Sequence, residues 1–238
     1  MPQKKDYIDK YPYIYDSNRQ EMKLKKILSF IFPLLLFFGI IFMGIHKIYN
    51  DHQLWLHFIN LDIIIIVLYI LWLLYESKIS IHDLNDQSAM SDHGTGFIYG
   101  FSQSLTILSA LYVTSIWKTP GMYHFIGLII FIFGVMFRMW AIRTLGRYYS
   151  HVVRKSKKHR IIDTGPYRFL RHPAYTGMII AHIGITLFYF NFITLAIILL
   201  FFIPSIILRI TIEEKMLFTI KGYKDFAMKR KRILPYIW

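Results

Sequence analysis

Long apolar runs separated by short polar segments dominate this sequence. They lie at Ile27–Ile45, Leu54–Tyr75, Phe97–Trp117, Met122–Ile142, Pro173–Phe190 and Phe192–Ile212. Each run approaches or reaches the roughly 20 residues that an α-helix needs to cross the hydrocarbon core of a bilayer. The pattern therefore predicts an all-α, polytopic membrane protein with about six transmembrane helices.

Composition agrees with this pattern. Hydrophobic residues make up 55% of the 238 residues, and the mean hydropathy of +0.41 is too high for an ordinary soluble domain. The first run follows a long polar segment and no small-residue cleavage site comes soon after it, so we expect a retained helix rather than a signal peptide. Cysteine is absent, which excludes disulfides, thiolate metal sites and a cysteine nucleophile.

Positive charge is concentrated beside the apolar runs. Of the net charge of +14, most belongs to the N-terminal tail (1–26), the 143–172 loop and the C-terminal tail. Under the positive-inside rule, both termini and this loop lie in the cytoplasm, with the acidic loop Glu76–Gly96 as the exception. Nucleic-acid binding is not expected, because no module of stacking aromatic residues accompanies the charges.

The chain divides by its chemical content. We expect a cytoplasmic tail at 1–26, a transmembrane scaffold at 27–120, and a chemically active membrane region with a cytoplasmic pocket at 121–238. The two final runs are joined by Asn191 alone, which predicts a tight helical hairpin. Such a hairpin returns Arg171–Tyr175 and Arg209–Glu214 to the same cytoplasmic surface.

The segment Arg171–Gly177 is the main candidate for chemistry. Pro173 suits a first helical position, and the N–H groups of a helix that starts there favour an anionic or polar ligand group. Arg209 and Glu213 share a helix face at i and i+4, and the alternative interpretation is a simple intrahelical ion pair. His172 is either a site residue or a helix cap, while His182 is interpreted as bonding a neighbouring helix.

Two further features are not assigned to a binding or catalytic site. His151, His159 and His172 lack a compact ligand spacing, so no metal site is predicted. The segment Lys215–Ile233 mixes apolar and basic residues. This pattern is typical of an interfacial amphipathic segment made of one or two short helices.

Six motifs in the C-terminal half resemble those of the isoprenylcysteine carboxyl methyltransferase family, in a form similar to its prokaryotic members and phospholipid methyltransferase relatives. They are Leu145-Gly146-Arg147, Ser150-His151-Val152, Thr164–Arg168, Arg171–Gly177, Arg209 and Glu213-Glu214. The resemblance implies a cytoplasm-facing pocket for S-adenosyl-L-methionine and a lipophilic acceptor that arrives from the bilayer. The sequence departs from the family pattern at Lys221-Gly222-Tyr223 and Phe226.

The resemblance also implies residue roles. The methyl donor would be held by His159, Arg160, Ile161, Ile162, Tyr167, His172, Pro173, Ala174, Tyr175 and Glu213. Arg209 would be the catalytic and substrate-binding residue. Glu213 can pair the donor's ammonium group, and Arg209 can hold a carboxylate by a two-pronged hydrogen bond.

The expected activity is methylation of an isoprenylcysteine carboxylate or a related lipophilic acid. An amine-lipid, phospholipid or phenolic-lipid methyltransferase is the nearest alternative, followed by an NADPH-dependent sterol-type reductase, and a non-catalytic membrane scaffold or transporter is a third class. The expected partners are membrane lipid and a lipophilic or prenylated acceptor. The expected location is a prokaryotic plasma membrane, with the endoplasmic reticulum as the alternative.

Overall fold

The computed structural model describes residues 31–49, 59–85, 94–117, 121–149 and 161–234. The chain divides into two units, Met1–Gly39 and Ile40–Trp238. In the first unit, the described residues 31–39 form the start of a helix that runs over Ile31–Tyr49. The site lies entirely in the second unit, which the following paragraphs describe.

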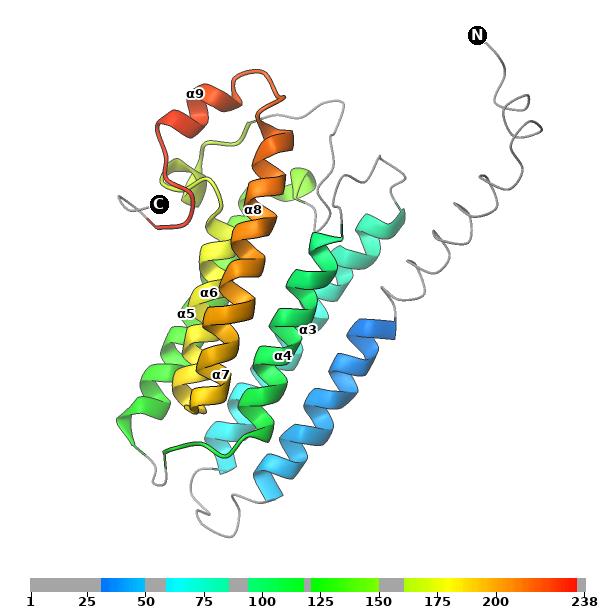
Figure 1. The fold of residues 1–238 in the computed structure, drawn as a ribbon, viewed down its shortest axis with the longest axis vertical. Coiled ribbons are helices and arrows are strands. Elements are labelled where there is room, and N and C mark those ends of the chain that lie inside the picture. The colour runs from blue at the N-terminus through cyan, green and yellow to red at the C-terminus, as the bar shows by residue number, and fades with distance from the viewer. Residues whose placement is uncertain (1–30, 50–58, 86–93, 118–120, 150–160, 235–238) are drawn as a thin grey trace, which may run out of the picture. The chain divides into compact units, whose positions relative to one another are not determined.

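The regular structure of the described residues is helical. Its elements are α3 (Ile59–Asn85), α4 (Thr95–Tyr112), α5 (Met122–Leu145), η1 (Gly146–Tyr148), η2 (Gly165–Arg168), α6 (Pro173–Phe188), α7 (Phe192–Ile197), η3 (Ile198–Phe202), α8 (Ile203–Leu217) and α9 (Tyr223–Met228). A helix therefore occurs at each apolar run, and the all-α prediction is confirmed for this part of the chain. Figure 1 shows α9 beside the C-terminal end of α8, with the α6–α7 turn at the opposite end of the bundle.

Three helices among the described residues are long and apolar enough to cross a membrane. They are Ile31–Tyr49, Met122–Leu145 and the continuous helix Phe192–Leu217, while the apolar helix Pro173–Phe188 is shorter. An integral membrane protein follows from these helices, and the larger number of about six crossings stays a prediction.

Close packing between α5 and α6 depends on glycines. Gly127 and Gly134 on α5 face Gly184 and Gly177 on α6, and each pair of glycines on one helix is seven residues apart. A Cβ atom on Gly177 would lie 2.6 Å from the backbone nitrogen of Arg138, and one on Gly127 would lie 2.9 Å from the carbonyl oxygen of Gly184. We call these four residues the glycine seam, and they let the two backbones touch directly.

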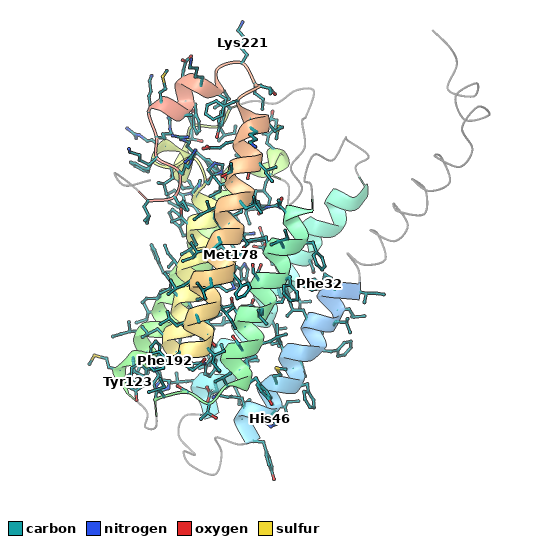
Figure 2. All side chains as sticks on the ribbon, in the orientation of Figure 1. Phe32, His46, Tyr123, Met178, Phe192 and Lys221 are labelled. Carbon is teal, nitrogen blue, oxygen red and sulfur yellow. The ribbon has the colours of Figure 1, made fainter. Side chains whose placement is uncertain are left out.

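The predicted C-terminal hairpin is confirmed, with a slightly longer turn. Helix α6 ends at Phe188, two residues earlier than the apolar run, so Tyr189–Asn191 form the connection. Asn191 begins the next helix, because its side-chain oxygen accepts a 2.8 Å hydrogen bond from the backbone N–H of Thr194. Phe192 lies at the end of the bundle opposite Lys221 (Figure 2).

The second arm of the hairpin changes its pitch near its centre. The π-helical turn η3 spans Ile198–Phe202 and is followed by Pro204 inside α8. Proline has no backbone N–H for the usual bond four residues back, and a wider turn accommodates that loss. Beyond this point α8 continues to Leu217, which brings its charged end to the start of α6.

The expected boundary of the acidic loop was wrong. Helix α3 continues to Asn85 instead of ending near Tyr75, so Glu76 is a helical residue and not a loop residue. Its carboxylate accepts hydrogen bonds from the Trp72 indole at 3.0 Å and from Arg138 of α5 at 2.9 Å. Because these bonds satisfy the charge, the helix extends through it.

The segment after α8 packs against the protein itself. Tyr223, Phe226 and Ala227 of α9 are buried in a cluster with Tyr167 and Ala174. This part of the predicted interfacial segment therefore turns its apolar face inward. Between Leu217 and Leu234, where the structure describes the chain, α9 is the one helix, and Met228 remains exposed on it.

Candidate functional site

The two open ends of the hairpin meet in one polar cluster, as the sequence predicted. The Tyr175 hydroxyl donates to Glu213 Oε2 at 3.0 Å. Arg171 Nη1 donates to Glu214 Oε1 at 2.8 Å, and His172 Nε2 lies 3.3 Å from the same oxygen. Helix α6 begins at Pro173 with His172 as its N-cap, so the predicted start of this helix is confirmed. Residues 172–175 are hereafter the site wall.

The adjacent carboxylates Glu213 and Glu214 occupy different environments. The Glu214 side chain is 4% exposed, and its oxygens accept bonds from Arg171, His172 and Arg232. The Glu213 side chain is 29% exposed and lies 3.9 Å from His172 Nδ1, and its Oε2 accepts the Tyr175 bond. A carboxylate has about four acceptor positions, so Glu213 retains the capacity to bind a cationic ligand group.

Arg209 lies inside the bundle at the level of Tyr175. It is 3% exposed, and its Nε donates to the Tyr175 hydroxyl at 2.8 Å. Its Nη1 lies 3.4 Å from Thr95 Oγ1, and its guanidinium carbon lies 5.7 Å from the Tyr99 ring centroid. The Tyr175 hydroxyl therefore connects Arg209 directly to Glu213.

Tyr167 is placed in the wall that supports the site. Its ring is buried in the cluster with Ala174 and Tyr223, and half-buried Ile161 packs against the same cluster. Burial, reinforced by the nearby Glu213 carboxylate, raises the pKa of the Tyr167 phenol. The phenol therefore stays protonated and acts by packing and not as a base.

The remaining predicted residues divide into two groups. Pro173 and Ala174 are buried in the first turn of α6, and Ile162 is partly exposed in the segment before η2. His159 and Arg160 lie outside the described residues. No group of three or more histidine, aspartate or glutamate side chains is arranged to hold a metal in the described part of the chain.

A buried ion pair behind the wall was missed by the sequence analysis. Arg138 is 1% exposed and bonds Glu76 of α3, while its Nη1 donates to the Ala174 carbonyl at 3.1 Å and its Nη2 to the Tyr149 hydroxyl at 3.1 Å. Its signal was an arginine inside the apolar run Met122–Ile142. A charge in such a run normally has a buried partner.

His182 lies further along α6 from the site. The sequence analysis expected it to make a structural hydrogen bond. Its ring is fully buried, and Nδ1 is 2.9 Å from the Met178 carbonyl in the preceding turn of the same helix. The expected partner on a neighbouring helix is therefore replaced by a backbone group of α6. The ring also packs against Phe202 with centroids 4.4 Å apart.

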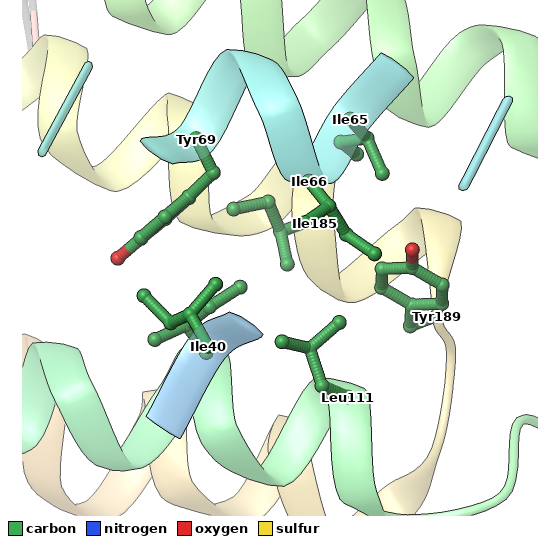
Figure 3. A pocket seen from close by; sticks show the side chains of 8 residues that line it. Ile40, Ile65, Ile66, Tyr69, Leu111, Ile185 and Tyr189 are labelled. Atoms are coloured by element: carbon green, nitrogen blue, oxygen red, sulfur yellow. The ribbon is translucent and has the colours of Figure 1, made fainter. Parts of the chain in front are cut away.

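An apolar cavity lies further along the bundle (Figure 3). It is small, with a volume of about 10 Å³, which is space for about one water molecule. Side chains from four helices line it: Ile40, Ile65, Ile66, Tyr69, Ile107, Leu111, Ile185 and Tyr189. Ile185 lies ten residues after Tyr175 on α6, so the cavity begins about 15 Å along the helix from the polar cluster.

The apolar helices and the polar cluster at one end of the hairpin define an α-helical integral membrane protein with a site at its helix ends. Comparison with known proteins gives a match to one family. Residues 126–219 match the isoprenylcysteine carboxyl methyltransferase family.

Individual relatives match about half of the chain. A probable protein-S-isoprenylcysteine O-methyltransferase of Oryza sativa subsp. indica is 32% identical over 117 residues, which are 48% of this chain and 61% of the relative. Protein-S-isoprenylcysteine O-methyltransferase B of Arabidopsis thaliana is 28% identical over 151 residues, 58% of this chain and 74% of the relative. The chain thus spans less than two thirds of the rice protein.

A solved structure was also matched. The eukaryotic intramembrane Ras methyltransferase, an isoprenylcysteine carboxyl methyltransferase solved without a monobody, is 20% identical with a TM-score of 0.45. The match covers 91% of this chain and 97% of that one.

Proposed function

We propose that this protein is an integral membrane methyltransferase that uses S-adenosyl-L-methionine to methylate the carboxylate of an isoprenylcysteine or a related lipophilic acid. The observation that carries the proposal is the Tyr175 hydroxyl, which bonds both Glu213 and Arg209. A partly exposed carboxylate and a buried guanidinium are thereby held on the two sides of one phenol.

The described residues fit a cationic methyl donor. Glu213 offers unused acceptor positions to the donor's ammonium group, and the Tyr175 and His172 rings, 5.9 Å apart, provide flat surfaces beside it. His159, Arg160, Ile161, Ile162, Pro173 and Ala174 would complete the binding site, with Tyr167 packed behind it. When bound, S-adenosyl-L-methionine supplies an electrophilic methyl group on a positively charged sulfur.

Arg209 would bind the methyl acceptor. Its Nε donates to Tyr175 and its Nη1 to Thr95, and the guanidinium held by these bonds would provide the counter-charge for the acceptor carboxylate. A carboxylate is ionised at neutral pH and needs no general base. The work of the protein is then to orient one carboxylate oxygen and to exclude water, because the reacting charges neutralise each other in the transition state.

The apolar side chains beyond the polar cluster suit a lipophilic acceptor. A chain whose carboxylate is held at Arg209 would extend along α6 toward Ile185, over the distance of about 15 Å between Tyr175 and the small apolar cavity. The lining is aliphatic apart from two tyrosines, Tyr69 and Tyr189. The basic 143–172 segment would lie at the cytoplasmic surface, in a prokaryotic plasma membrane or the endoplasmic reticulum.

Binding of radiolabelled S-adenosyl-L-methionine to the purified full-length protein tests the donor assignment. We expect saturable binding by the wild type, loss of binding in Glu213→Ala, and normal binding in Lys215→Ala, which changes an exposed charge two residues away. Absence of donor binding by the wild type, or tight NADPH binding in its place, would contradict the proposal.

Transfer of a radiolabelled methyl group to N-acetyl-S-farnesylcysteine tests the acceptor assignment. Arg209→Ala is expected to retain donor binding and to lose methyl transfer, because the acceptor carboxylate loses its counter-charge. Normal transfer by Arg209→Ala would show that Arg209 does not bind the acceptor.

A further inference from the structure

The C-terminal residues 230–233, hereafter the C-terminal strap, lie directly against the start of the site wall. Leu170 and Lys231 form a parallel β-bridge. The backbone N–H of Arg171 donates to the Lys231 carbonyl at 2.8 Å, and that of His172 donates to the Arg232 carbonyl at 2.9 Å. The Thr176 hydroxyl donates to the Ile233 carbonyl at 2.8 Å. The strap therefore holds the chain on both sides of Pro173, through two backbone amides before it and a side-chain hydroxyl after it.

The strap also reaches the site through a side chain. Arg232 Nε donates to Glu214 Oε2 at 2.9 Å, while the other oxygen of Glu214 bonds Arg171 and lies 3.3 Å from His172 Nε2. With Nε2 held by Glu214, the opposite ring nitrogen, Nδ1, points to Glu213 at 3.9 Å. Arg232 is thus connected through Glu214 to the orientation of the His172 ring.

We infer that Arg232 is a positioning residue of the donor site, acting through Glu214 to orient His172 beside Glu213. The inference rests on the proposed function. The family match ends at residue 219, so the strap lies beyond the matched region. The bond that connects Arg232 to the site is to the buried Glu214, so Arg232 acts through that carboxylate.

The physical argument concerns the second oxygen of Glu214. This carboxylate is nearly enclosed, so removing Arg232 leaves Oε2 without its charged donor. The carboxylate is then free to turn toward Arg171, and its bond to His172 weakens. The strap simultaneously loses this charge-assisted contact with Glu214, which loosens the carbonyl groups that hold residues 171 and 172.

Three variants separate this role from general destabilisation. Arg232→Ala removes the contact, Arg232→Lys keeps the charge, and Lys231→Ala changes an exposed side chain of the same strap, whose contribution is its backbone carbonyl. Loss of one charged hydrogen bond predicts a donor Kd raised about tenfold in Arg232→Ala, partly restored in Arg232→Lys and unchanged in Lys231→Ala. The KM for the acceptor should stay within about twofold of wild type.

A second measurement does not depend on the donor. Hydrogen exchange of the ligand-free protein, followed by mass spectrometry, should show faster exchange of the Arg171 and His172 amides in Arg232→Ala and normal exchange in Lys231→Ala. Faster exchange together with weaker donor binding supports the inference. Wild-type donor affinity in Arg232→Ala, or equal effects of Arg232→Ala and Lys231→Ala, overturns it.

The two proposals fail differently. If the wild type binds no S-adenosyl-L-methionine, the proposed function is wrong and the donor-site role of Arg232 falls with it, while the exchange rates still decide whether Arg232 holds the wall. If the wild type binds the donor and Arg232→Ala binds it equally well, only the positioning role is wrong.

Discussion

Replacing Glu76 by alanine removes one partner of the buried ion pair between α3 and α5. Arg138 would keep its 3.1 Å bonds to the Ala174 carbonyl and the Tyr149 hydroxyl, and would lose those from Nε and Nη2 to the carboxylate. Two charged hydrogen bonds at about 1.5–3 kcal/mol each give a loss of roughly 3–6 kcal/mol. That range agrees with the 3–5 kcal/mol typical of an orphaned buried charge.

The assay is reversible unfolding of the purified protein in mixed micelles, with the free energy of unfolding as the readout. Ser77→Ala, at an exposed neighbouring position whose hydroxyl bonds its own helix, is the matched control and should change stability by less than about 1 kcal/mol. The double variant Glu76→Leu with Arg138→Met should lose less than Glu76→Ala alone, because no charge is left buried.

The reasoning is refuted if Glu76→Ala is as stable as Ser77→Ala. It is also refuted if the double variant loses the sum of the losses of Glu76→Leu and Arg138→Met measured singly, since the partners would then act independently. A second consequence is functional. Arg138 holds the Ala174 carbonyl of the site wall, so Glu76→Ala should weaken donor binding as well, whereas Ser77→Ala should leave it unchanged.

Three further predictions concern the seam, the hairpin turn and the bridging phenol. Gly184→Ala places a Cβ atom 2.7 Å from the Gly127 carbonyl oxygen and should cost about 1–3 kcal/mol in unfolding, whereas Ile183→Ala, at an exposed position beside it, should cost less. Asn191→Ala removes the cap bond to Thr194 and should cost about 1 kcal/mol by the same assay, and an unchanged stability would mean that the cap is replaceable. Tyr175→Phe keeps the ring but breaks both hydroxyl bonds, so the donor Kd and the acceptor KM should rise together by roughly three- to tenfold in binding and transfer assays; an effect on one constant alone would contradict the bridging role.

The sequence was sufficient for the helices and for the meeting of distant residues in the hairpin. Apolar runs predict helices because a run of this length can bury its apolar surface as a helix. A short turn such as Tyr189–Asn191 then requires the next helix to run antiparallel to the one before it. Tyr175 and Glu213 are therefore brought together by topology alone. Their atomic contact through one hydroxyl also depends on how α6 and α8 are rotated, which the sequence pattern does not specify.

The features that were missed depend on contacts between distant segments. The Glu76–Arg138 pair joins residues 62 positions apart, and a charged residue at the end of an apolar run resembles the start of a loop when its partner is unknown. The inward packing of Tyr223 and Phe226 has the same origin, because an amphipathic segment shows which face is apolar without showing what covers it. The strap is held largely by backbone carbonyls, which carry no residue-specific signal.

Under the proposed function, the glycine seam limits where the choice of acceptor can change. Two helices that touch backbone to backbone leave no space for a side chain of variable size, so the α5-facing surface of α6 offers no position for tuning a ligand's shape. Ile185 on α6 and Tyr189 directly after it line the cavity together with residues of α3 and α4, and they have no such restriction. Relatives that accept different lipids should therefore differ at the cavity lining while they keep the seam, and a designed change of specificity should begin at the lining.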